Sequence, residues 1–303
     1  MVFLAPLEKA PETVAGGRRV FLKREDRHAL GAFKWRGALP AVEAFRARGA
    51  AGIVTASTGN HGSATAWAAQ QRNLPANVYA PLGASLAKLA LIEHYGARVR
   101  LTGRDLDEAK QAARQDALEN GLAFFEDGAE PAQYAGYGAI AEEILEQSEE
   151  PPAAIVVPVG NGALIGGIGE AVRRRRLAIL LVGVAAREAP VMALSFEAGR
   201  PVPCDRMATF ADGLAVRVAI PYAVAVMRRV VDRVLLVSER EIARALGAAA
   251  ASGLRVEGAA AAALAALPLL DDISGPIVAI VTGSNIDDAL YRRAVEDPGS
   301  FPD

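Results

Sequence analysis

Lysine is rare in this chain, and one lysine has unusual neighbours. Lysine occurs among the 303 residues only at positions 9, 23, 34, 88 and 110, whereas arginine is common. Lys34 stands between Phe33 and Trp35, where a predicted helix begins. Aromatic neighbours provide a desolvated pocket in which a lysine amine can stay neutral and react with a carbonyl compound. A lysine that snorkels to the surface is the alternative, and this segment alone leaves both interpretations open.

A cluster of small polar residues follows an apolar run at Gly52–Ala56. Its sequence is Ser57-Thr58-Gly59-Asn60-His61-Gly62, and an alanine-rich helix is predicted after it over Ser63–Gln70. Backbone N–H groups at the start of a helix form an anion site that suits a carboxylate or a phosphate. A plain N-cap needs only one hydroxyl, which would not explain four polar side chains within five residues. The cluster therefore predicts an anion-binding loop.

A glycine-rich turn follows a second apolar run. The sequence Gly160-Asn161-Gly162-Ala163-Leu164 separates a predicted strand from a predicted helix, and closely spaced glycines let backbone amides approach a phosphate. The main alternative is a dinucleotide site. That site requires G-x-G-x-x-G and an acid after the next strand, but the third glycine here is Gly166 and the next strand ends in Val184-Ala-Ala. The turn thus favours a simple phosphate.

The fourth polar segment lies near the carboxyl end. The apolar run Ile277–Val281 leads into Thr282-Gly283-Ser284-Asn285. Hydroxyls at the carboxyl edge of a parallel sheet lie where α/β proteins bind ligands, although an ordinary turn explains this segment equally well. Considered together, the four segments offer a lysine, two amide-lined anion sites and a neutral hydroxyl. A phosphorylated pyridine aldehyde requires this combination.

Strands and helices that alternate along the chain must position these segments. The pattern at Leu106–Glu119 predicts a helix, with Gly121 just beyond it where a left-handed cap is expected. Regular alternation predicts an α/β fold with parallel sheets covered on both faces. Short apolar runs predict strands at Val20–Lys23, Gly52–Ala56, Asn77–Ala80, Arg98–Leu101, Ala154–Pro158, Ile179–Val184, Val234–Val237 and Ile277–Val281.

Composition excludes several classes of protein. Hydrophobic residues make up 52% and charged residues 22%, which is ordinary for a globular enzyme and unlike a disordered chain. The net charge of -2 gives no argument for nucleic acid or an anionic membrane as partner. The single Cys204 excludes an internal disulfide and suits the cytoplasm. The N-terminus lacks a secretory signal pattern, and the alanine-rich stretch Gly247–Leu270 predicts a buried helix rather than a membrane span.

The four segments, in their order and spacing, resemble the serine/threonine dehydratase and serine racemase branch of the fold-type II pyridoxal-phosphate enzymes. The resemblance runs from about Leu4 to Asp287. Its most specific parts are Phe33-Lys34-x-Arg-Gly-Ala and Ser57-Thr-Gly-Asn-His-Gly62. It is supported by Ala135-Gly-Tyr-Gly-Ala-Ile-Ala141, Thr209-Phe-Ala-Asp-Gly213 and Thr282-Gly-Ser-Asn285.

The resemblance implies a role for each matching residue. Lys34 corresponds to the lysine that forms a Schiff base with pyridoxal 5'-phosphate and is catalytic. Asn60 corresponds to the residue that hydrogen-bonds the cofactor's phenolic oxygen, Thr282 to the hydroxyl residue that faces the pyridine nitrogen, and Glu257 to an acid near the ring. The phosphate cradle corresponds to Gly160, Asn161, Gly162, Ala163 and Leu164. The loop that binds the substrate carboxylate corresponds to Ser57, Thr58, Gly59, Asn60 and His61.

Several positions depart from the family pattern. Ala32 replaces the usual serine, and Asn161 and Ala163 replace two glycines of the phosphate cradle. Tyr137, which we expect to contact the substrate, replaces a glutamine that dehydratases often have. Racemases place a catalytic serine at the position of Thr58, whose hydroxyl is retained but whose rotamers are restricted. Acids of the family's divalent-metal site would align near Ala185 and Val191, so we expect no metal there.

The resemblance implies two open, mostly parallel twisted sheets with helices on both faces. We expect a large cofactor-binding domain of residues 1–50 and 134–303 and a small substrate-loop domain of residues 51–133. The expected reaction is β-elimination of a β-hydroxy amino acid such as L-threonine or L-serine to a 2-oxo acid and ammonia. An amino-acid racemase, a β-replacement or threonine-synthase-like enzyme, and a non-catalytic ligand-binding protein are the alternatives. We expect no C-terminal regulatory domain, and a homodimer is expected by analogy.

Overall fold

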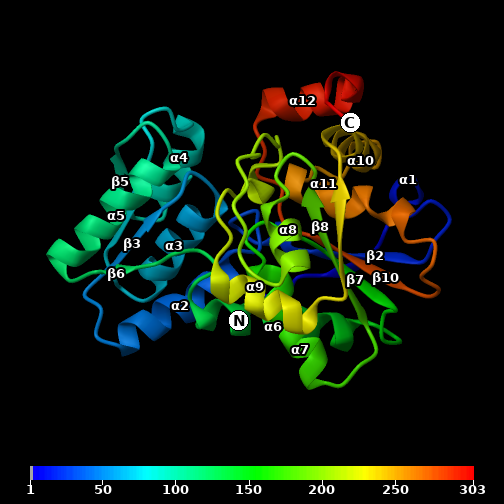
Figure 1. Ribbon diagram of the computed structural model, residues 1–303, viewed down its shortest axis with the longest axis horizontal. Helices are drawn as coiled ribbons and strands as arrows, with labels where there is room; N and C mark the ends of the chain where they lie inside the picture. Colours follow the sequence, from blue (N-terminus) through cyan, green and yellow to red (C-terminus); the bar gives the residue numbers. More distant parts are fainter. Residues whose placement is uncertain (1–2) are drawn as a thin grey trace. The chain divides into compact units, whose positions relative to one another are not determined.

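The computed structural model describes residues 3–303, except for the side chains of residues 87 and 88. The chain forms two compact units (Figure 1). The first contains the residues up to Phe33 together with Tyr137–Asp303, and the second contains Lys34–Gly136. We expected boundaries after residues 50 and 133. Helix α2 (Trp35–Ala47) groups with the second unit because it packs against α3 (Asn60–Gln71).

The first unit is built on a six-stranded sheet in the order β1-β2-β10-β7-β8-β9. Only β1 is antiparallel, to β2; the other pairs are parallel. The strands are β1 (Leu7–Lys9), β2 (Val20–Arg24), β7 (Ala154–Pro158), β8 (Leu180–Ala186), β9 (Arg233–Val237) and β10 (Ile277–Val281). All residues of β7 and β10 are buried, as continuous apolar strands in a parallel sheet should be when both faces are covered.

Helices cover both faces of this sheet. Helix α11 (Gly258–Ala265) packs on β7, β8 and β10, with α10 (Glu239–Ala250) outside it, while α7 (Ala163–Arg174) lies on the other face (Figure 1). The remaining elements are α1 (Glu12–Ala15), η1 (Glu25–Arg27), α6 (Pro131–Gln147), α8 (Val191–Ala198), η2 (Asp212–Leu214), α9 (Pro221–Val230), η3 (Leu267–Leu269), α12 (Asp288–Glu296) and η4 (Pro298–Ser300). Helix α6 runs through the boundary between the units, at Gly136 and Tyr137.

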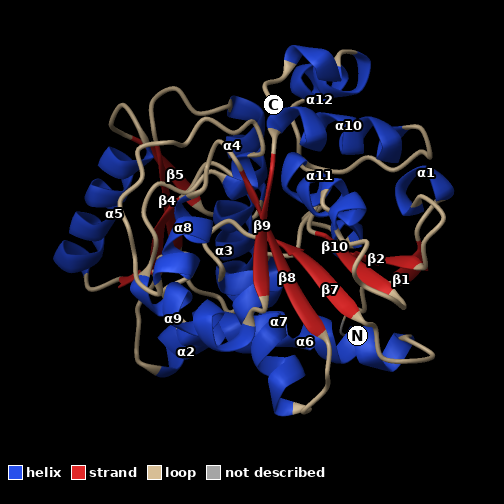
Figure 2. Ribbon diagram, turned by 45° about the vertical axis from the view of Figure 1, so that its right-hand side comes forward, coloured by secondary structure: helices blue, strands red, loops and turns tan. Residues whose placement is uncertain are grey.

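The second unit has a four-stranded parallel sheet in the order β5-β4-β3-β6. Its strands are β3 (Ile53–Ala56), β4 (Ala76–Ala80), β5 (Arg98–Leu101) and β6 (Ala123–Phe124). Helix α5 (Leu106–Asn120) covers one face and α3 the other (Figure 2). Helix α4 (Leu86–His94) connects β4 to β5. The α/β fold with two mainly parallel sheets is therefore confirmed.

Local sequence signals explain where several helices begin and end. Asp105 caps α5 by accepting hydrogen bonds from the amides of Asp107 and Glu108, and Gly121 ends the helix in the left-handed conformation, with φ 62°. The expected strands are all present, within two residues at each end, and β1 and β6 are additional short strands. None of the helices described over residues 3–303 is long and apolar enough to cross a membrane.

Two helix predictions were wrong in detail. Helix α3 begins at Asn60 rather than Ser63, so Asn60 and His61 lie in its first turn instead of in the preceding loop. The stretch Gly247–Leu270 is not one helix, because the chain leaves α10 after Ala250 and begins α11 only at Gly258. The break contains Gly253, whose φ of 74° is compatible with a turn but not with a helix.

Candidate active site

The predicted site residues fall into two groups, one in each unit. The second unit holds Lys34, Ser57, Thr58, Gly59, Asn60 and His61. The first holds Tyr137, Gly160, Asn161, Gly162, Ala163, Leu164, Glu257 and Thr282. Each group forms a local polar arrangement of its own, and we describe them in turn.

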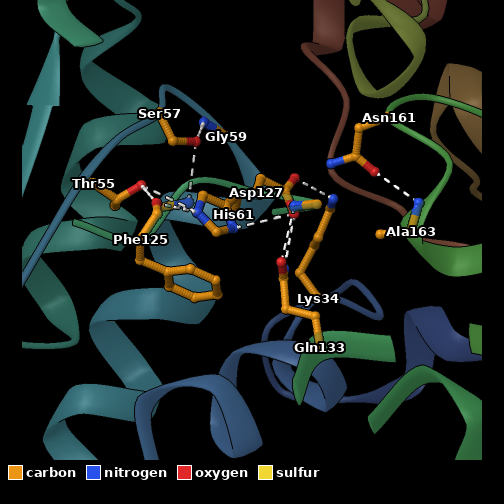
Figure 3. A network of polar contacts seen from close by, with 12 residues as sticks. Lys34, Thr55, Ser57, Gly59, His61, Phe125, Asp127, Gln133, Asn161 and Ala163 are labelled. Carbon is orange, nitrogen blue, oxygen red and sulfur yellow. Dashed lines mark hydrogen bonds and ion pairs between the residues drawn. The ribbon is translucent and has the colours of Figure 1, made fainter. Parts of the chain in front are cut away.

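Lys34 is the N-cap residue of α2, as its position before a helical pattern predicted. The preceding residue, Phe33, is fixed in the first unit by a hydrogen bond of 2.9 Å from its amide to the carbonyl of Thr282. The Lys34 ammonium donates to Asp127 Oδ2 at 2.5 Å (Figure 3). Its side chain is only 17% exposed, so this amine is not a snorkelling surface group.

Asp127 is held in place by more than Lys34. Gln133 Nε2 donates to Asp127 Oδ1 at 3.0 Å, and His61 Nδ1 lies 3.6 Å from the same oxygen (Figure 3). Burial of Asp127 opposes its ionisation, but the charges of Lys34 and His61 and the hydrogen bonds outweigh this effect. The pKa of Asp127 is therefore held well below its usual range. The carboxylate remains charged at neutral pH.

His61 is buried and faces two polar partners besides Asp127. Its Nε2 lies 3.1 Å from Thr55 Oγ1 and 3.4 Å from the carbonyl of Phe125. Thr55 Oγ1 donates to that carbonyl at 2.7 Å, because the carbonyl has no proton to give. Since the hydroxyl proton is used in this bond, His61 Nε2 donates to Thr55 Oγ1. Burial lowers the pKa of His61, although Asp127 opposes this effect.

The loop before α3 is organised by Ser57. Its Oγ accepts hydrogen bonds from the amides of Gly59 at 3.2 Å and Gly62 at 3.0 Å. Ser57 therefore does the work of a helix cap, which was the plainer of the two interpretations of this loop. Thr58, Gly59 and Asn60 are partly exposed. Binding of a substrate carboxylate here remains a prediction.

The glycine turn of the first unit connects β7 to α7. Gly162 is the N-cap of α7 and has the left-handed conformation, with φ 86°. Because it is a glycine, it offers no side-chain oxygen to cap the helix. A Cβ atom at residue 160 would lie 2.3 Å from the carbonyl oxygen of Gly213, and one at residue 162 would lie 2.4 Å from Met227 Sδ. Both positions therefore require glycine. Asn161 Oδ1 accepts from the amide of Ala163 at 3.0 Å, so this asparagine uses one amide of the turn.

Thr282 and Glu257 form a buried pair in the first unit. Thr282 Oγ1 donates to Glu257 Oε1 at 2.7 Å, and both residues are 2% exposed. The amide of Glu257 donates to the carbonyl of Gly283 at 2.9 Å. A Cβ at residue 283 would lie 2.7 Å from Glu257 Oε2, so this glycine makes room for the carboxylate. The family resemblance in the sequence pointed to both residues but did not predict the hydrogen bond between them.

Tyr137 is fully buried in the first unit, where its ring lies 5.2 Å from that of Phe33. Its expected contact with a substrate stays a prediction. Asp127 and Gln133 were missed in the sequence. Asp127 comes after β6, a strand of two residues that has no recognisable pattern, and Gln133 carries no motif. A rule that polar residues follow parallel strands would have found Asp127 only if β6 had been recognised.

The residues of the glycine turn fit the phosphate of pyridoxal phosphate. The turn combines a left-handed Gly162 with the first amides of a twelve-residue helix, and the first turn of that helix carries no acidic side chain. Such a turn binds anions through backbone N–H groups and the helix dipole. Lys34 supplies a half-buried amine for the aldehyde, and Thr282 supplies a buried hydroxyl. The donor set therefore suits this cofactor.

Comparisons with known proteins agree with the geometry. Residues 2–283 match the family described as pyridoxal-phosphate dependent enzyme. The L-threonine ammonia-lyase of Geobacter sulfurreducens is 38% identical over 284 residues, which cover 92% of this chain and 70% of that protein.

Two solved structures are also similar. Threonine deaminase isoform 2 from Solanum lycopersicum has a TM-score of 0.91 and 30% identity, and the match covers 96% of this chain and 87% of that one. Maize serine racemase has a TM-score of 0.88 and 27% identity, covering 96% and 91%. The chain belongs to the pyridoxal-phosphate dependent enzymes, in the fold-type II serine/threonine dehydratase family, and its cofactor is pyridoxal 5'-phosphate.

Proposed function

We propose that this enzyme is an ammonia-lyase that eliminates the β-hydroxyl of an amino acid such as L-threonine or L-serine, giving a 2-oxo acid and ammonia. The observation that carries the proposal is the half-buried Lys34 amine at the start of α2, in a chain 38% identical to an L-threonine ammonia-lyase. The substrate is thus a small amino acid. L-threonine and L-serine are favoured because the structural relatives include a threonine deaminase.

Each site residue has a proposed task. Lys34 would bond the cofactor through Nζ, Gly160–Leu164 would bind its phosphate, and Asn60 its phenolic oxygen. Thr282, supported by Glu257, would face the ring nitrogen. The bound cofactor supplies an electron sink for the electron pair left on the substrate's Cα.

The remaining tasks concern the substrate. The loop Ser57–His61 would bind the substrate carboxylate through amides and hydroxyls, and Tyr137 would border the substrate. Lys34 Nζ, once released by the substrate amine, would take the proton from Cα as a general base. In the domain assignment that goes with these roles, residues 1–50 and 134–303 bind the cofactor and residues 51–133 carry the substrate loop.

Racemisation is the second candidate, and one observation favours it. Thr58, at the position of the racemases' catalytic serine, is partly exposed, and maize serine racemase has a TM-score of 0.88 to this chain. Thr58 would then return a proton to Cα from the face opposite Lys34. A threonine hydroxyl at this position is restricted in its rotamers, so we favour elimination. We further propose a cytoplasmic homodimer, supported by family analogy and by the single Cys204, which leaves no internal disulfide.

Incubation of the purified protein with L-threonine, L-serine and other β-hydroxy amino acids tests the proposal. We expect a 2-oxo acid and ammonia in equal amounts, and none of either from Lys34→Ala. Formation of the D-isomer without oxo acid would instead support a racemase. A protein that takes up the cofactor but gives neither product would point to β-replacement, and a colourless protein that never takes up pyridoxal phosphate would point to a non-catalytic binding protein.

A further inference from the structure

The second unit contains an acid that the proposed reaction does not yet use. Asp127 follows β6 and contacts the Lys34 ammonium through Oδ2 at 2.5 Å. The two side chains are 17% and 23% exposed, so water screens this ion pair far less than it screens a surface pair. Lys34 Nζ is the atom on which the proposed chemistry depends. The acid beside it therefore affects that chemistry directly.

The position of Asp127 is fixed by the first turn of α6. Gln133 Nε2 donates to Asp127 Oδ1 at 3.0 Å, while Gln133 Oε1 accepts from the amide of Gly128 at 2.8 Å. Tyr134 adds a hydrogen bond of 2.8 Å from its hydroxyl to the carbonyl of Gly128. Gln133 and Tyr134 are buried, which limits the access of water to these bonds. The Asp127 side chain and the backbone of the next residue, Gly128, are therefore both fixed by hydrogen bonds from α6.

Two basic side chains, Lys34 and His61, face the carboxylate of Asp127. His61 Nδ1 lies 3.6 Å from Asp127 Oδ1, on the opposite side from Lys34 (Figure 3). The neighbouring acid, Glu126, is engaged elsewhere: it binds Lys110 at 3.1 Å and Arg114 at 2.9 Å. The charge beside Lys34 is therefore that of Asp127 and not that of the adjacent Glu126.

We propose that Asp127 is the positioning residue of Lys34, whose carboxylate holds the ammonium that forms at Nζ each time Lys34 takes the substrate's Cα proton. In that step the Cα–H bond breaks, an N–H bond forms at Nζ, and the bonding electron pair stays on the substrate carbon. The neutral amine becomes a cation, and the fixed negative charge of Asp127 stabilises it. This inference rests on the proposed function for its catalytic part, but the ion pair itself does not.

The ion pair also predicts a property of the full chain freed of its cofactor. An amine held as an ammonium by a carboxylate is a poor nucleophile, because only the neutral form attacks a carbonyl reagent. Removing the charge of Asp127 should therefore make Lys34 more reactive. The hydrogen bond that engages Nζ is charge-assisted and mostly shielded from water, so its loss should raise the reactivity by about tenfold or more.

Acetylation of Lys34 in the cofactor-stripped protein, followed by peptide mass spectrometry at pH 7, measures this property. We expect Asp127→Asn to be labelled at Lys34 at least about tenfold faster than the wild type. Asp127→Glu, which restores the charge, should return the rate toward that of the wild type. Glu126→Gln is the matched control, since it removes an adjacent charge that does not reach Lys34, and its rate should be unchanged.

With cofactor bound, kcat of Asp127→Asn should fall by about tenfold to a hundredfold, with KM within about threefold of the wild type. Unchanged labelling of Lys34 in Asp127→Asn would overturn the proposal. If that variant does not fold, Asp127→Ser, which also removes the charge, must show the same increase in labelling, and a wild-type rate there would overturn the proposal equally. Faster labelling in a protein without lyase activity would retain the ion pair and refute the proposed function instead.

Discussion

Replacing Gly160 by alanine places a methyl group against the backbone of the neighbouring loop. The new Cβ would lie 2.3 Å from the carbonyl oxygen of Gly213, where about 3.4 Å is needed for contact. One of the two segments must therefore move by roughly 1 Å, which is the kind of overpacking that costs about 1–3 kcal/mol. The glycine turn is the proposed phosphate site, so the cofactor should be bound less tightly as well.

The loop that carries Gly213 cannot easily retreat. Leu214 donates to the carbonyl of Ala211 at 2.7 Å, and upstream Glu239 Oε2 accepts from the amide of Phe210 at 2.9 Å. We therefore expect the glycine turn to shift instead. If the whole cost appears in cofactor binding, the dissociation constant of pyridoxal phosphate rises by about fivefold to 150-fold.

Two measurements on Gly160→Ala test this reasoning: cofactor titration by absorbance and thermal unfolding. A loss of about 1–3 kcal/mol lowers Tm by roughly 2–5 °C in a chain of this size. Gly247→Ala is the control in the same unit, because its Cβ would meet only the carbonyl of Val295 at 3.8 Å and its site is helical. That variant should keep cofactor affinity and gain up to about 1 kcal/mol of stability. Wild-type affinity and Tm in Gly160→Ala would refute the steric argument.

Three further outcomes follow from buried polar groups. Thr282→Val should lower the free energy of unfolding by about 1–3 kcal/mol in denaturant titrations, because the buried Glu257 carboxylate loses this donor. Thr282→Ser keeps a hydroxyl and should retain most of the wild-type stability. Lys23→Met should cost about 3–5 kcal/mol in the same assay, since Glu143 would lose a cation that lies 2.6 Å away in the core. A loss of stability smaller than that caused by Arg19→Met, which breaks the exposed pair with Glu150, would contradict this. Burial lowers the pKa of His61, so the contribution of the His61 side chain to stability is complete above about pH 6.5 and is lost as the pH falls. Tm of His61→Gln should therefore depend less on pH between 7 and 5 than Tm of the wild type. An equal dependence of Tm on pH in both proteins would contradict the lowered pKa of His61.

The strands of both sheets were predictable because burial on two faces leaves a plain signature. The runs Ala154–Pro158 and Ile277–Val281 are apolar throughout and appear as β7 and β10 with those bounds. Strands β1 and β6, of three and two residues, are defined by the neighbour they pair with and not by their own side chains. Short edge strands of this kind have no periodicity to detect.

The start of α3 was misplaced for a local reason. Asn and His are weak helix formers, and small polar residues favour turns, so the sequence suggested that the loop extended to Gly62. In the structure Ser57 Oγ accepts from the amides of Gly59 and Gly62, and this cap lets the helix begin at Asn60. The cap depends on a backbone path that no single residue type specifies.

Within the site, motifs predicted residues but not their contacts. Lys34, the glycine turn and Thr282 carry recognisable neighbours along the chain, whereas the pairing of Thr282 with Glu257 joins residues that lie 25 positions apart. Asp127 was not recognisable, because it contacts Lys34 from 93 positions away and its own surroundings, Glu126 and Gly128, resemble an ordinary turn. Contacts of this kind are set by the packing of β6 and α6.

The covalent bond between Lys34 and the cofactor can be located directly. The purified coloured protein is reduced with borohydride, digested and mapped by mass spectrometry. Because the chain has lysine only at positions 9, 23, 34, 88 and 110, the adducts can be distinguished without ambiguity. We predict a phosphopyridoxyl group on the peptide that contains Lys34 and none in Lys34→Ala. An adduct on another lysine, or no adduct in a coloured protein, would show that Lys34 does not hold the cofactor.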